Sequence, residues 1–556
     1  IVCELSQPHS PSDINNMIPF YDLLAPVSVS FASQFFQQYK HYPFYTSYLE
    51  CATEELAQDL SNCLCHVLFE LFSESLPFGT RINRFYQQLS DSLLLPRSQY
   101  YDFVRLTFDN NFIELLNRYP MSVYYIGQSL FYWHHRHIEL LSRLDLSLHQ
   151  FNETPLINLS SLSFSPFNCG DNHNFNRRSY TLTYCQGDTF SGKICYKPRS
   201  VANDLYFFNL LDALNEVNDL QLRLPRCYDF GDFGFTEFIE SEPIAESDVR
   251  QSQFNDGIWL FLLWVFGFTD CTCENFVFNC NQHVLVDFET AFTGFFRISS
   301  KSSAYMSTRE LLNYSCTRTT LLPRWDLIID DRFSTDVSCF GDYLFHRTDS
   351  FSPWIHTNTD FMLYEESFNK IANPDSVSLG NLLLSNINND IHENIINGFN
   401  YANDCLFELI NQQMRDISSS LSLYSRFIFR DTASYSLFLF ELYSPISMSS
   451  TTAYFNSLDK LDRLAIDHPS NSFVEWITDN EKIQLFNQDI PYYLTDINAQ
   501  SLDCVFGRYP GFSKIYNSGY EFITQLIKNR PLFELQSFLI ETSLKSQISS
   551  TEYHIE

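Results

Sequence analysis

Four polar side chains surround two short apolar runs in the stretch TDCTCENFVFNCNQHVLVDFETAF, residues 269–292. They are Asp270, Asn275, Asp287 and Glu289. Burying a bare carboxylate is costly, so acidic groups beside apolar runs need hydrogen-bond donors or a metal ion as partners. Carboxylate and amide oxygens are ligands that suit Mg²⁺. We therefore expect this stretch to hold a magnesium ion.

The spacing of these residues is typical of a site for phosphoryl transfer. In protein kinases the catalytic Asp and a metal-binding Asn share one loop, and a second metal-binding Asp follows a hairpin. Asp270 and Asn275 have the kinase spacing of five positions (275 − 270), and FVF and VLV are expected to form a hairpin before Asp287. Lys197, in ICYKPRS, lies on an expected strand before an expected helix, like the kinase lysine that binds phosphates. The pattern predicts a site for ATP and Mg²⁺.

Each of these matches also has a purely structural explanation. Asp270 could cap a turn, Asn275 could form an Asx-turn, and Lys197 could face solvent. The order of a strand with a lysine, a helix, an Asp–Asn loop, a hairpin and D-x-E favours the functional interpretation. No G-x-G-x-x-G loop precedes Lys197, so an ordinary protein kinase is not expected and another segment must cover the phosphates.

Six segments occur in an order that resembles the dehydratase domain of class II (LanM-type) lanthipeptide synthetases. They are GDNHNFNRRS, YKPRS, GFTEFIE, TDCTCENFVFN, VLVDFETAF and SRFIFRDTASY, between Gly170 and Tyr435. The family reads G-D-x-H, Y-K-P-R-S, Y-G-W-x-E-F, T-D-x-H-x-E-N, D-x-E-T and R-x-x-x-R-P-T. The resemblance implies a lipid-kinase-like core. It also implies an enzyme that phosphorylates Ser or Thr of a peptide and then eliminates the phosphate, leaving dehydroalanine or dehydrobutyrine.

The resemblance implies a role for each residue that matches a kinase-type motif. Asp270 matches the catalytic Asp that orients or deprotonates the substrate hydroxyl. Asn275 and Asp287 match the magnesium ligands. Glu289 matches an acid that binds metal or positions phosphate, and Lys197 matches the lysine that serves both half-reactions.

Four further residues match positions that the family uses for elimination. They are Asp171, His173, Arg426 and Thr432. Loss of phosphate needs a base for the α-proton and cations for the departing dianion. Arg426 supplies a guanidinium that is always charged, and His173 can exchange protons near neutral pH, with Asp171 expected to set its tautomer. The structural alternatives are a turn at Asp171 and His173, and an ion pair between Arg430 and Asp431.

The chain departs from the family pattern at several places. Thr272 replaces the His of T-D-x-H, and Asp431 replaces the Pro of R-P-T. The link between His173 and Lys197 is longer than usual, through a wider turn expected at QGDTFSGK. After Tyr435 the sequence has 121 residues (556 − 435) with a single cysteine, whereas the family's cyclase holds zinc with two Cys and one His. We expect a dehydratase without a cyclase, for which a separate cyclase would be a partner.

Composition excludes several classes of protein. The formal net charge is −31 with only 35 Lys and Arg, so a nucleic-acid binder is not expected. The longest uncharged apolar run, residues 257–269, is shorter than the ~20 residues that span a membrane. The 15 cysteines show no paired C-x-x-C spacing, which indicates reduced thiols in a cytosol, either bacterial or that of a host into which the protein is secreted. The HHRH string at residues 134–137 favours a packed helix end over a metal site.

Periodicity predicts an α+β protein in three parts. Residues 1–160 show apolar residues at three- and four-residue spacing and are expected to be mainly helical. Residues 161–300 change to a period of two and are expected to form the kinase-like core with the Lys and Asp/Asn/Asp motifs. Residues 301–556 are expected to be mainly helical and to carry the elimination motif. The predicted fold is a lipid-kinase-like two-lobed core with large helical additions at both ends.

Two other functions are compatible with the sequence. One is a Ser/Thr kinase that stops at phosphorylation, if Thr272 and Asp431 have disabled elimination. The other is a degenerate nucleotide-binding scaffold that does not turn over ATP. The expected substrate is a Ser/Thr-containing precursor peptide or a protein, and the sequence does not identify it.

Overall fold

The computed structural model describes most of the chain, and the statements below concern that part. The described residues are 18–42, 44–81, 95–151, 162–163, 170–186, 190–218, 220, 222–242, 246–272, 274–297, 312–323, 325–330, 333–336, 338–340, 354–364, 391–417, 423–463, 471–528 and 535–544. The turn expected at QGDTFSGK includes residues 187–189, which lie outside this set.

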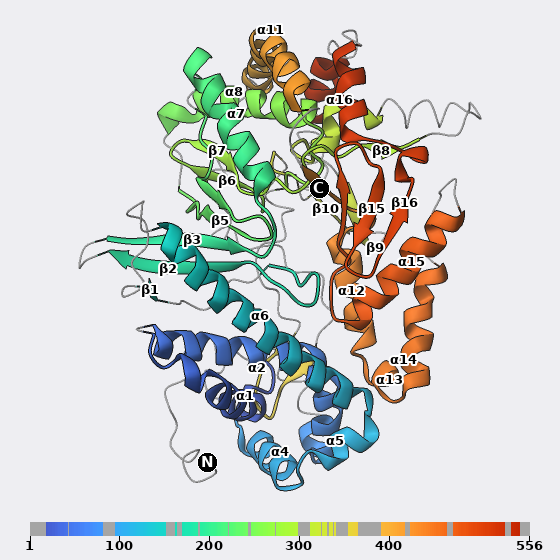
Figure 1. The fold of residues 1–556 in the computed structure, drawn as a ribbon. Coiled ribbons are helices and arrows are strands. Elements are labelled where there is room, and N and C mark those ends of the chain that lie inside the picture. The colour runs from blue at the N-terminus through green and yellow to red at the C-terminus, as the bar shows by residue number, and fades with distance from the viewer. Residues whose placement is uncertain are drawn as a thin grey trace.

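A layer of helices forms the lower part of the molecule in Figure 1. Apolar residues at helical spacing give the longest of them, α2 and α6, a buried stripe, and the Trp133 indole of α6 donates to the Ala52 carbonyl of α2 at 2.8 Å. The layer consists of α1 (Tyr21–Phe35), η2 (Phe36–Tyr39), α2 (Tyr45–Ser75), α4 (Ser98–Asp109), α5 (Ile113–Arg118) and α6 (Met121–Phe151).

An antiparallel sheet lies against α6 and carries Lys197 at the end of its central strand. Its strand order is β1 (Leu162–Ser163), β2 (Tyr180–Gln186), β3 (Phe190–Lys197), β5 (Gly234–Glu237) and β4 (Cys227–Asp229). Arg143 of α6 donates to the Tyr196 hydroxyl of β3 at 2.6 Å. Lys197 pairs with Gly234 of β5. A Cβ atom at Gly234 would come within 2.3 Å of the Val201 side chain. Glycine at this position therefore lets the end of β5 pack against the segment that leads into helix α7 (Ala202–Asn218).

Helix α8 (Val249–Val265) forms the centre of a second core, at the top of Figure 1. It is buried along nearly its whole length, as the apolar run GIWLFLLWVFGF predicts. Helix α11 (Ile391–Ile417) crosses it at two glycines: a Cβ on Gly257 would lie 2.0 Å from the Ile395 carbonyl, and one on Gly398 would lie 1.9 Å from the Phe254 carbonyl. None of the described helices combines the length and the apolar character that a bilayer-spanning helix needs.

The hairpin expected between Asn275 and Asp287 is present. Strand β6 (Phe276–Asn279) pairs with β7 (Gln282–Leu285) in antiparallel register, with Phe276 opposite Leu285. Cys280 and Asn281 form the turn with positive φ angles of 49° and 63°. This pairing places the residues before β6 and after β7 side by side.

The C-terminal region contains a four-stranded antiparallel sheet that the sequence analysis did not predict. Its order is β13 (Tyr424–Phe427), β14 (Tyr493–Asp496), β15 (Ser501–Cys504) and β16 (Gly507–Pro510). The helices beside it are α12 (Thr432–Leu442), α13 (Pro445–Met448), α14 (Thr451–Leu458), η9 (Asp459–Arg463) and α15 (Asn471–Phe486). It forms a third, aromatic core with Phe473 and Phe512, both fully buried.

The remaining elements are short. They are η5 (Glu246–Asp248), β8 (Phe295–Phe296) paired with β17 (Tyr516–Asn517), η6 (Cys316–Thr319), β9 (Trp325–Asp330) paired with β10 (Phe333–Asp336), β11 (Trp354–Ile355) paired with β12 (Leu363–Tyr364), η10 (Phe512–Lys514) and α16 (Gly519–Lys528). The structure therefore mixes helices with antiparallel sheets, which confirms the α+β class. A lipid-kinase-like core and the three-part division remain predictions.

Candidate active site

Lys197 lies inside a group of charged side chains rather than facing solvent. Its Nζ donates to the Val286 carbonyl at 2.9 Å, lies 3.1 Å from Asp287 Oδ2, and is 3.9 Å from Asp204 Oδ1 on α7. Because the side chain is only 9% exposed, the solvent-facing alternative is wrong. Lys197 thus joins the end of β3 to the segment after β7.

The hairpin β6–β7 brings Asn275, Asp270 and Asp287 to one place. Val286 N–H donates to the Asn275 carbonyl at 2.9 Å, which extends the ladder to the base of the hairpin. The Asn275 amide donates to the Asp270 carbonyl at 2.9 Å and lies 3.5 Å from Asp270 Oδ2. Asn275 therefore stabilises the loop as a donor, which differs from the Asx-turn of the structural alternative, and remains beside the carboxylate of Asp270.

Arg199 is a central member of the group that sequence reasoning missed. Its guanidinium donates to Asp287 Oδ1 at 2.6 Å and lies 3.2 Å from Glu289 Oε2 and 3.4 Å from Asp204 Oδ2. The available signal was its position in YKPRS, two residues beyond Lys197. Arg199 therefore links three carboxylates, one on α7 and two in the segment after β7.

Glu289 lies between two arginines. Arg426 Nη1 contacts Glu289 Oε1, and the Arg426 backbone N–H donates to the Glu289 carbonyl at 2.7 Å. Burial raises the pKa of Glu289, but the positive charges of Arg426 and Arg199 outweigh it and the pKa is lowered. Asp287 behaves alike: burial raises its pKa, and Arg199 and Lys197 bring it well below its usual range. Both carboxylates are ionised.

Asp270 differs from Asp287 and Glu289 because its pKa is raised and not lowered. Burial raises its pKa to about 6, with Arg426 opposing the rise and Glu289 and Asp287 adding to it. A carboxylate with this pKa is still mostly charged at pH 7 and is a stronger base than an exposed Asp. Asp270 is therefore suited to accept a proton.

His173 lies on a tight turn, close enough to Glu289 and Arg426 for their charges to act on it. Its Nδ1 is 2.8 Å from the Ile490 carbonyl, and its ring centroid is 5.1 Å from that of Tyr492. Burial and then the Arg426 charge lower its pKa to about 4. Since a carbonyl only accepts, Nδ1 carries the proton and Nε2 keeps a free lone pair.

Ile490, and not Asp171, therefore sets the His173 tautomer, which corrects the sequence-based expectation. The reason is that the segment before β14 runs alongside the turn, with Ile490 N–H donating to the Asn172 carbonyl at 2.7 Å. Asp171 is exposed at the rim, where the charges of Arg426 and Glu289 act on it.

The elimination motif near residue 430 is only partly assembled. Arg426 belongs to the group, whereas Thr432 opens α12, where its carbonyl accepts from the Ser436 hydroxyl at 3.0 Å. Arg430 does not pair with Asp431: it lies 2.9 Å from the buried Glu481 on α15, because Asp431 instead caps α12 through Ser434 N–H.

The fit of the proposed metal ligands rests on their chemistry. Asn275, Asp287 and Glu289 offer oxygen donors, the type that suits Mg²⁺. Among the described residues no three His, Cys, Asp or Glu side chains form a group that could hold a metal ion. Lys197, Arg199 and Arg426 pair with the carboxylates of the site instead. Residues 134–137 lie in the middle of α6 and not at a helix end, so that part of the prediction is wrong. The packing is present, because His137 is fully buried with its Nδ1 2.5 Å from the Tyr48 hydroxyl.

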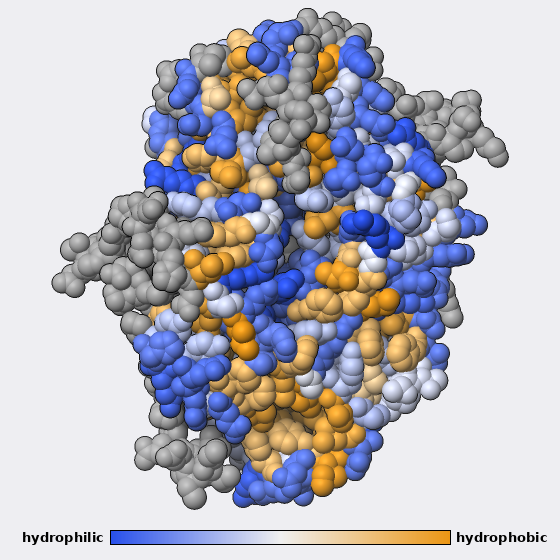
Figure 2. Space-filling model, viewed as in Figure 1, coloured by the Kyte–Doolittle hydropathy of each residue, from blue (hydrophilic) through white to orange (hydrophobic). Residues whose placement is uncertain are grey.

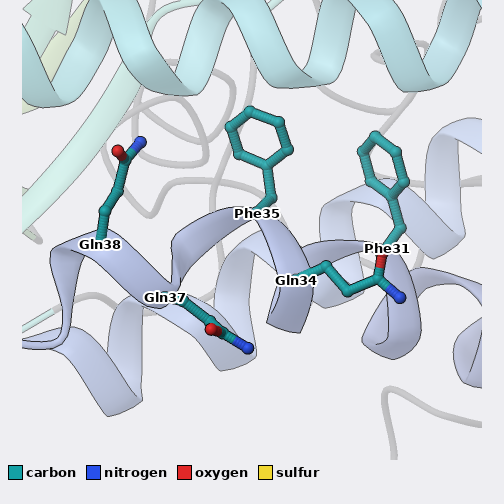
Figure 3. A pocket seen from close by; sticks show the side chains of 5 residues that line it. All are labelled: Phe31, Gln34, Phe35, Gln37 and Gln38. Carbon is teal, nitrogen blue, oxygen red and sulfur yellow. The ribbon is translucent and has the colours of Figure 1, made fainter.

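The surface of the molecule is hollowed in more than one place. On the face drawn in Figure 2, hydrophilic residues border a hollow near the middle of the molecule, at the level where the sheet meets the C-terminal strands in Figure 1. Another hollow, on α1 and η2, shares no residue with the charged group. Figure 3 shows its lining residues, Phe31, Gln34, Phe35, Gln37 and Gln38.

The charged group lies in a part of the chain that resembles known proteins. Residues 119–496 match a family model described as a domain of unknown function (DUF4135), and the chain belongs to that family. It is also 22% identical, over 335 residues, to the lacticin 481/lactococcin biosynthesis protein LcnDR2 of Lactococcus lactis subsp. lactis. That match covers 56% of this chain and 34% of the relative, so it spans about a third of the relative's length. Every residue of the charged group lies within the family match.

Proposed function

We propose that the chain is an ATP- and Mg²⁺-dependent dehydratase that phosphorylates Ser or Thr of a peptide and then eliminates the phosphate. One observation carries the proposal: Lys197, Arg199 and Arg426 converge on Asp287 and Glu289, beside Asp270 with its raised pKa. This arrangement offers cations for phosphate, oxygens for a metal and a base in one place. The Lactococcus relative is named for lacticin 481 biosynthesis, so a lanthipeptide precursor is the substrate we propose.

Cofactor binding requires an exchange of partners within the group. Asn275, Asp287 and Glu289 would hold Mg²⁺, which when bound offsets phosphate charge while ATP supplies the phosphoryl group. The carboxylates would release Lys197 and Arg199, whose N–H donors then become available for phosphate oxygens. Lys197 and Arg199 would thus stabilise the acidic side chains before the cofactor binds and the phosphate groups afterwards.

In the first half-reaction Asp270 acts on the substrate hydroxyl. Its ionised carboxylate accepts the hydroxyl proton as the oxygen attacks the terminal phosphorus. The Asn275 amide, bonded to the Asp270 carbonyl, keeps the loop in place. The bond to the nucleotide leaving group breaks, and a phosphoserine or phosphothreonine forms.

In the second half-reaction the α-proton and the phosphate leave. His173 Nε2 has the lone pair needed to accept the proton, and a phosphate dianion bound nearby would raise its low pKa. The electron pair of the C–H bond forms the new C=C bond, and the pair of the C–O bond departs with phosphate. Arg426 and Arg199 stabilise the leaving dianion.

The test is product mass. The protein is incubated with ATP, Mg²⁺ and a Ser/Thr-containing peptide library, and peptides are analysed by mass spectrometry. Loss of one water per modified site, abolished by Asp270→Asn, supports a dehydratase. Unchanged peptide mass in the library and in a lanthipeptide precursor would contradict it.

A second candidate is a kinase that stops at phosphorylation. It is favoured by the position of Thr432, which opens α12 beside the capping Asp431. It predicts a stable phosphate adduct whose formation is unchanged by Arg426→Ala. The same mass measurement separates the two functions.

A further inference from the structure

The turn that carries His173 has an unusual backbone. Asn174, Phe175 and Asn176 are consecutive and all left-handed, with φ angles of 50°, 69° and 62°. A left-handed residue with a side chain is disfavoured, and a bulky aromatic one most of all. Phe175 is also exposed at 42%, so burial of its ring does not explain the conformation. Other contacts must stabilise this turn.

Asp489 provides those contacts from within the core. Its Oδ2 accepts from Phe175 N–H at 2.8 Å, and its Oδ1 accepts from Asn176 N–H at 2.6 Å, while the residue itself is fully buried. Its neighbour Ile490 bonds the same turn through Asn172 and His173. A carboxylate is the side chain that can accept from two N–H groups at once without a donor of its own.

The opposite side of the turn is attached to the helical layer. Arg178 Nε contacts Asn172 Oδ1, and Arg136 Nη1 contacts Asn176 Oδ1. Both arginines belong to a buried ion cluster with Asp59 of α2. The base of the turn is thus fixed from one side, and its left-handed tip is held by Asp489.

We propose that Asp489 is a positioning residue for phosphate elimination, holding the turn so that the His173 ring stays beside Tyr492 and Arg426. The inference rests on the proposed function and assigns Asp489 to its second half-reaction alone. Asp489 makes no bond to the Lys197–Asp287–Asn275 side of the site in the described structure. Loss of its two bonds therefore affects elimination and spares phosphorylation.

The variant Asp489→Asn tests this by separating the half-reactions. Asparagine keeps one acceptor oxygen and places a donor where the second was, so one of the two turn bonds is lost. Elimination from a synthetic phosphoserine peptide is expected to fall about 10²-fold, the scale of a misplaced catalytic group, and phosphopeptide accumulates from ATP. Phosphorylation of the unmodified peptide stays within about two-fold, because orientation at Asp270 is untouched. Asp479→Asn, at an exposed position of α15 and with the same charge change, is the control and leaves both rates unchanged.

A double-mutant cycle distinguishes positioning from general loss of structure. If Asp489 acts through His173, Asp489→Asn has no further effect on elimination in a His173→Gln background. An equal fall of both half-reactions, a further loss in that background, or unchanged elimination would each overturn the inference. Wild-type protein that neither phosphorylates nor eliminates would overturn the proposed function itself, and this inference with it.

Discussion

The molecule contains two groups of ion pairs with different character. The helical layer holds a buried cluster of two carboxylates and two arginines, which are Glu55, Asp59, Arg136 and Arg178. The candidate site holds three cations and four carboxylates, which are Lys197, Arg199, Arg426, Asp204, Asp270, Asp287 and Glu289. The first group is balanced in charge, whereas the second has one acid more than it has bases.

Burial distinguishes the two groups as well. Arg136 is 2% exposed, whereas Asp287 is 25% exposed. In the helical cluster, burial raises the pKa of Glu55 but Arg136 and His137 bring it well below its usual range. In the site, the pKa of Asp287 is lowered in the same way by Arg199 and Lys197, and the difference lies in Asp270, whose pKa burial raises. A closed and neutral cluster stabilises the fold, and an open one with surplus acid can exchange partners with ligands.

The largest effect is expected when the cation common to both half-reactions is removed. Lys197→Met leaves Asp287 with one partner fewer and removes a charge from the phosphate position. Turnover should fall about 10³-fold or more, since preorganised charges that stabilise the transferred phosphoryl group supply a large part of the rate enhancement. Lys193→Met on the same strand, where Lys193 is exposed and pairs with Glu240, is the matched control. The loss of water per peptide measures the turnover of both variants. Equal turnover would exclude a catalytic role for Lys197.

Breaking the helical cluster should affect stability rather than chemistry. Arg136→Met leaves Asp59 and Glu55 buried with one cation fewer, so the free energy of unfolding should fall by about 3–5 kcal/mol. Arg105→Met, which breaks the exposed pair with Asp102, should change it by less than about 1 kcal/mol. Urea unfolding followed by circular dichroism measures both. Equal losses in the free energy of unfolding would mean that burial does not determine how much these ion pairs contribute to stability.

A smaller effect is expected for Arg426→Lys, which keeps the charge and loses the planar fork. Glu289 then loses one of its two arginine partners, and the leaving phosphate loses a bidentate contact. Elimination from a phosphopeptide should slow about 10²-fold, with phosphorylation reduced less. The rates of phosphopeptide decay and of ADP release measure the two steps. Equal reduction of both would place Arg426 in phosphorylation instead.

The smallest expected effect is a pH dependence. The raised pKa of Asp270, about 6, means that its carboxylate is charged above pH 6 and protonated below it. Only the charged form accepts a proton, so phosphorylation should be nearly constant from pH 7 upward and fall about ten-fold for each unit below pH 6. Initial ADP release between pH 5 and pH 8 measures this. A profile that falls only below pH 4 would assign the base to another group.

The part of the site that local spacing encodes could be predicted from the sequence. Asp270, Asn275 and Asp287 flank one hairpin, so alternation and loop length were enough to bring them together. The family resemblance assigned Arg426 to the elimination step, but its pairing with Glu289, 137 residues away, was not predicted. No local pattern marks a long-range contact of that kind.

What the sequence did not reveal has physical reasons. Asp489 and Ile490 act through backbone groups of a distant turn, so no motif surrounds them. The C-terminal strands are four residues each, too short for a period of two to stand out from their helical surroundings. Arg199 was visible in YKPRS, but its link to three carboxylates depends on the packing of α7.

The contact between Gly257 and Gly398 limits how this molecule can move. With backbone against backbone at that crossing, α8 and α11 cannot slide past each other without a collision, and neither helix has room to tilt at the contact. The loop of Asp270 follows directly from α8, so its position is tied to an immobile support. We therefore expect the loop of Asp270 to keep its position when a peptide substrate binds.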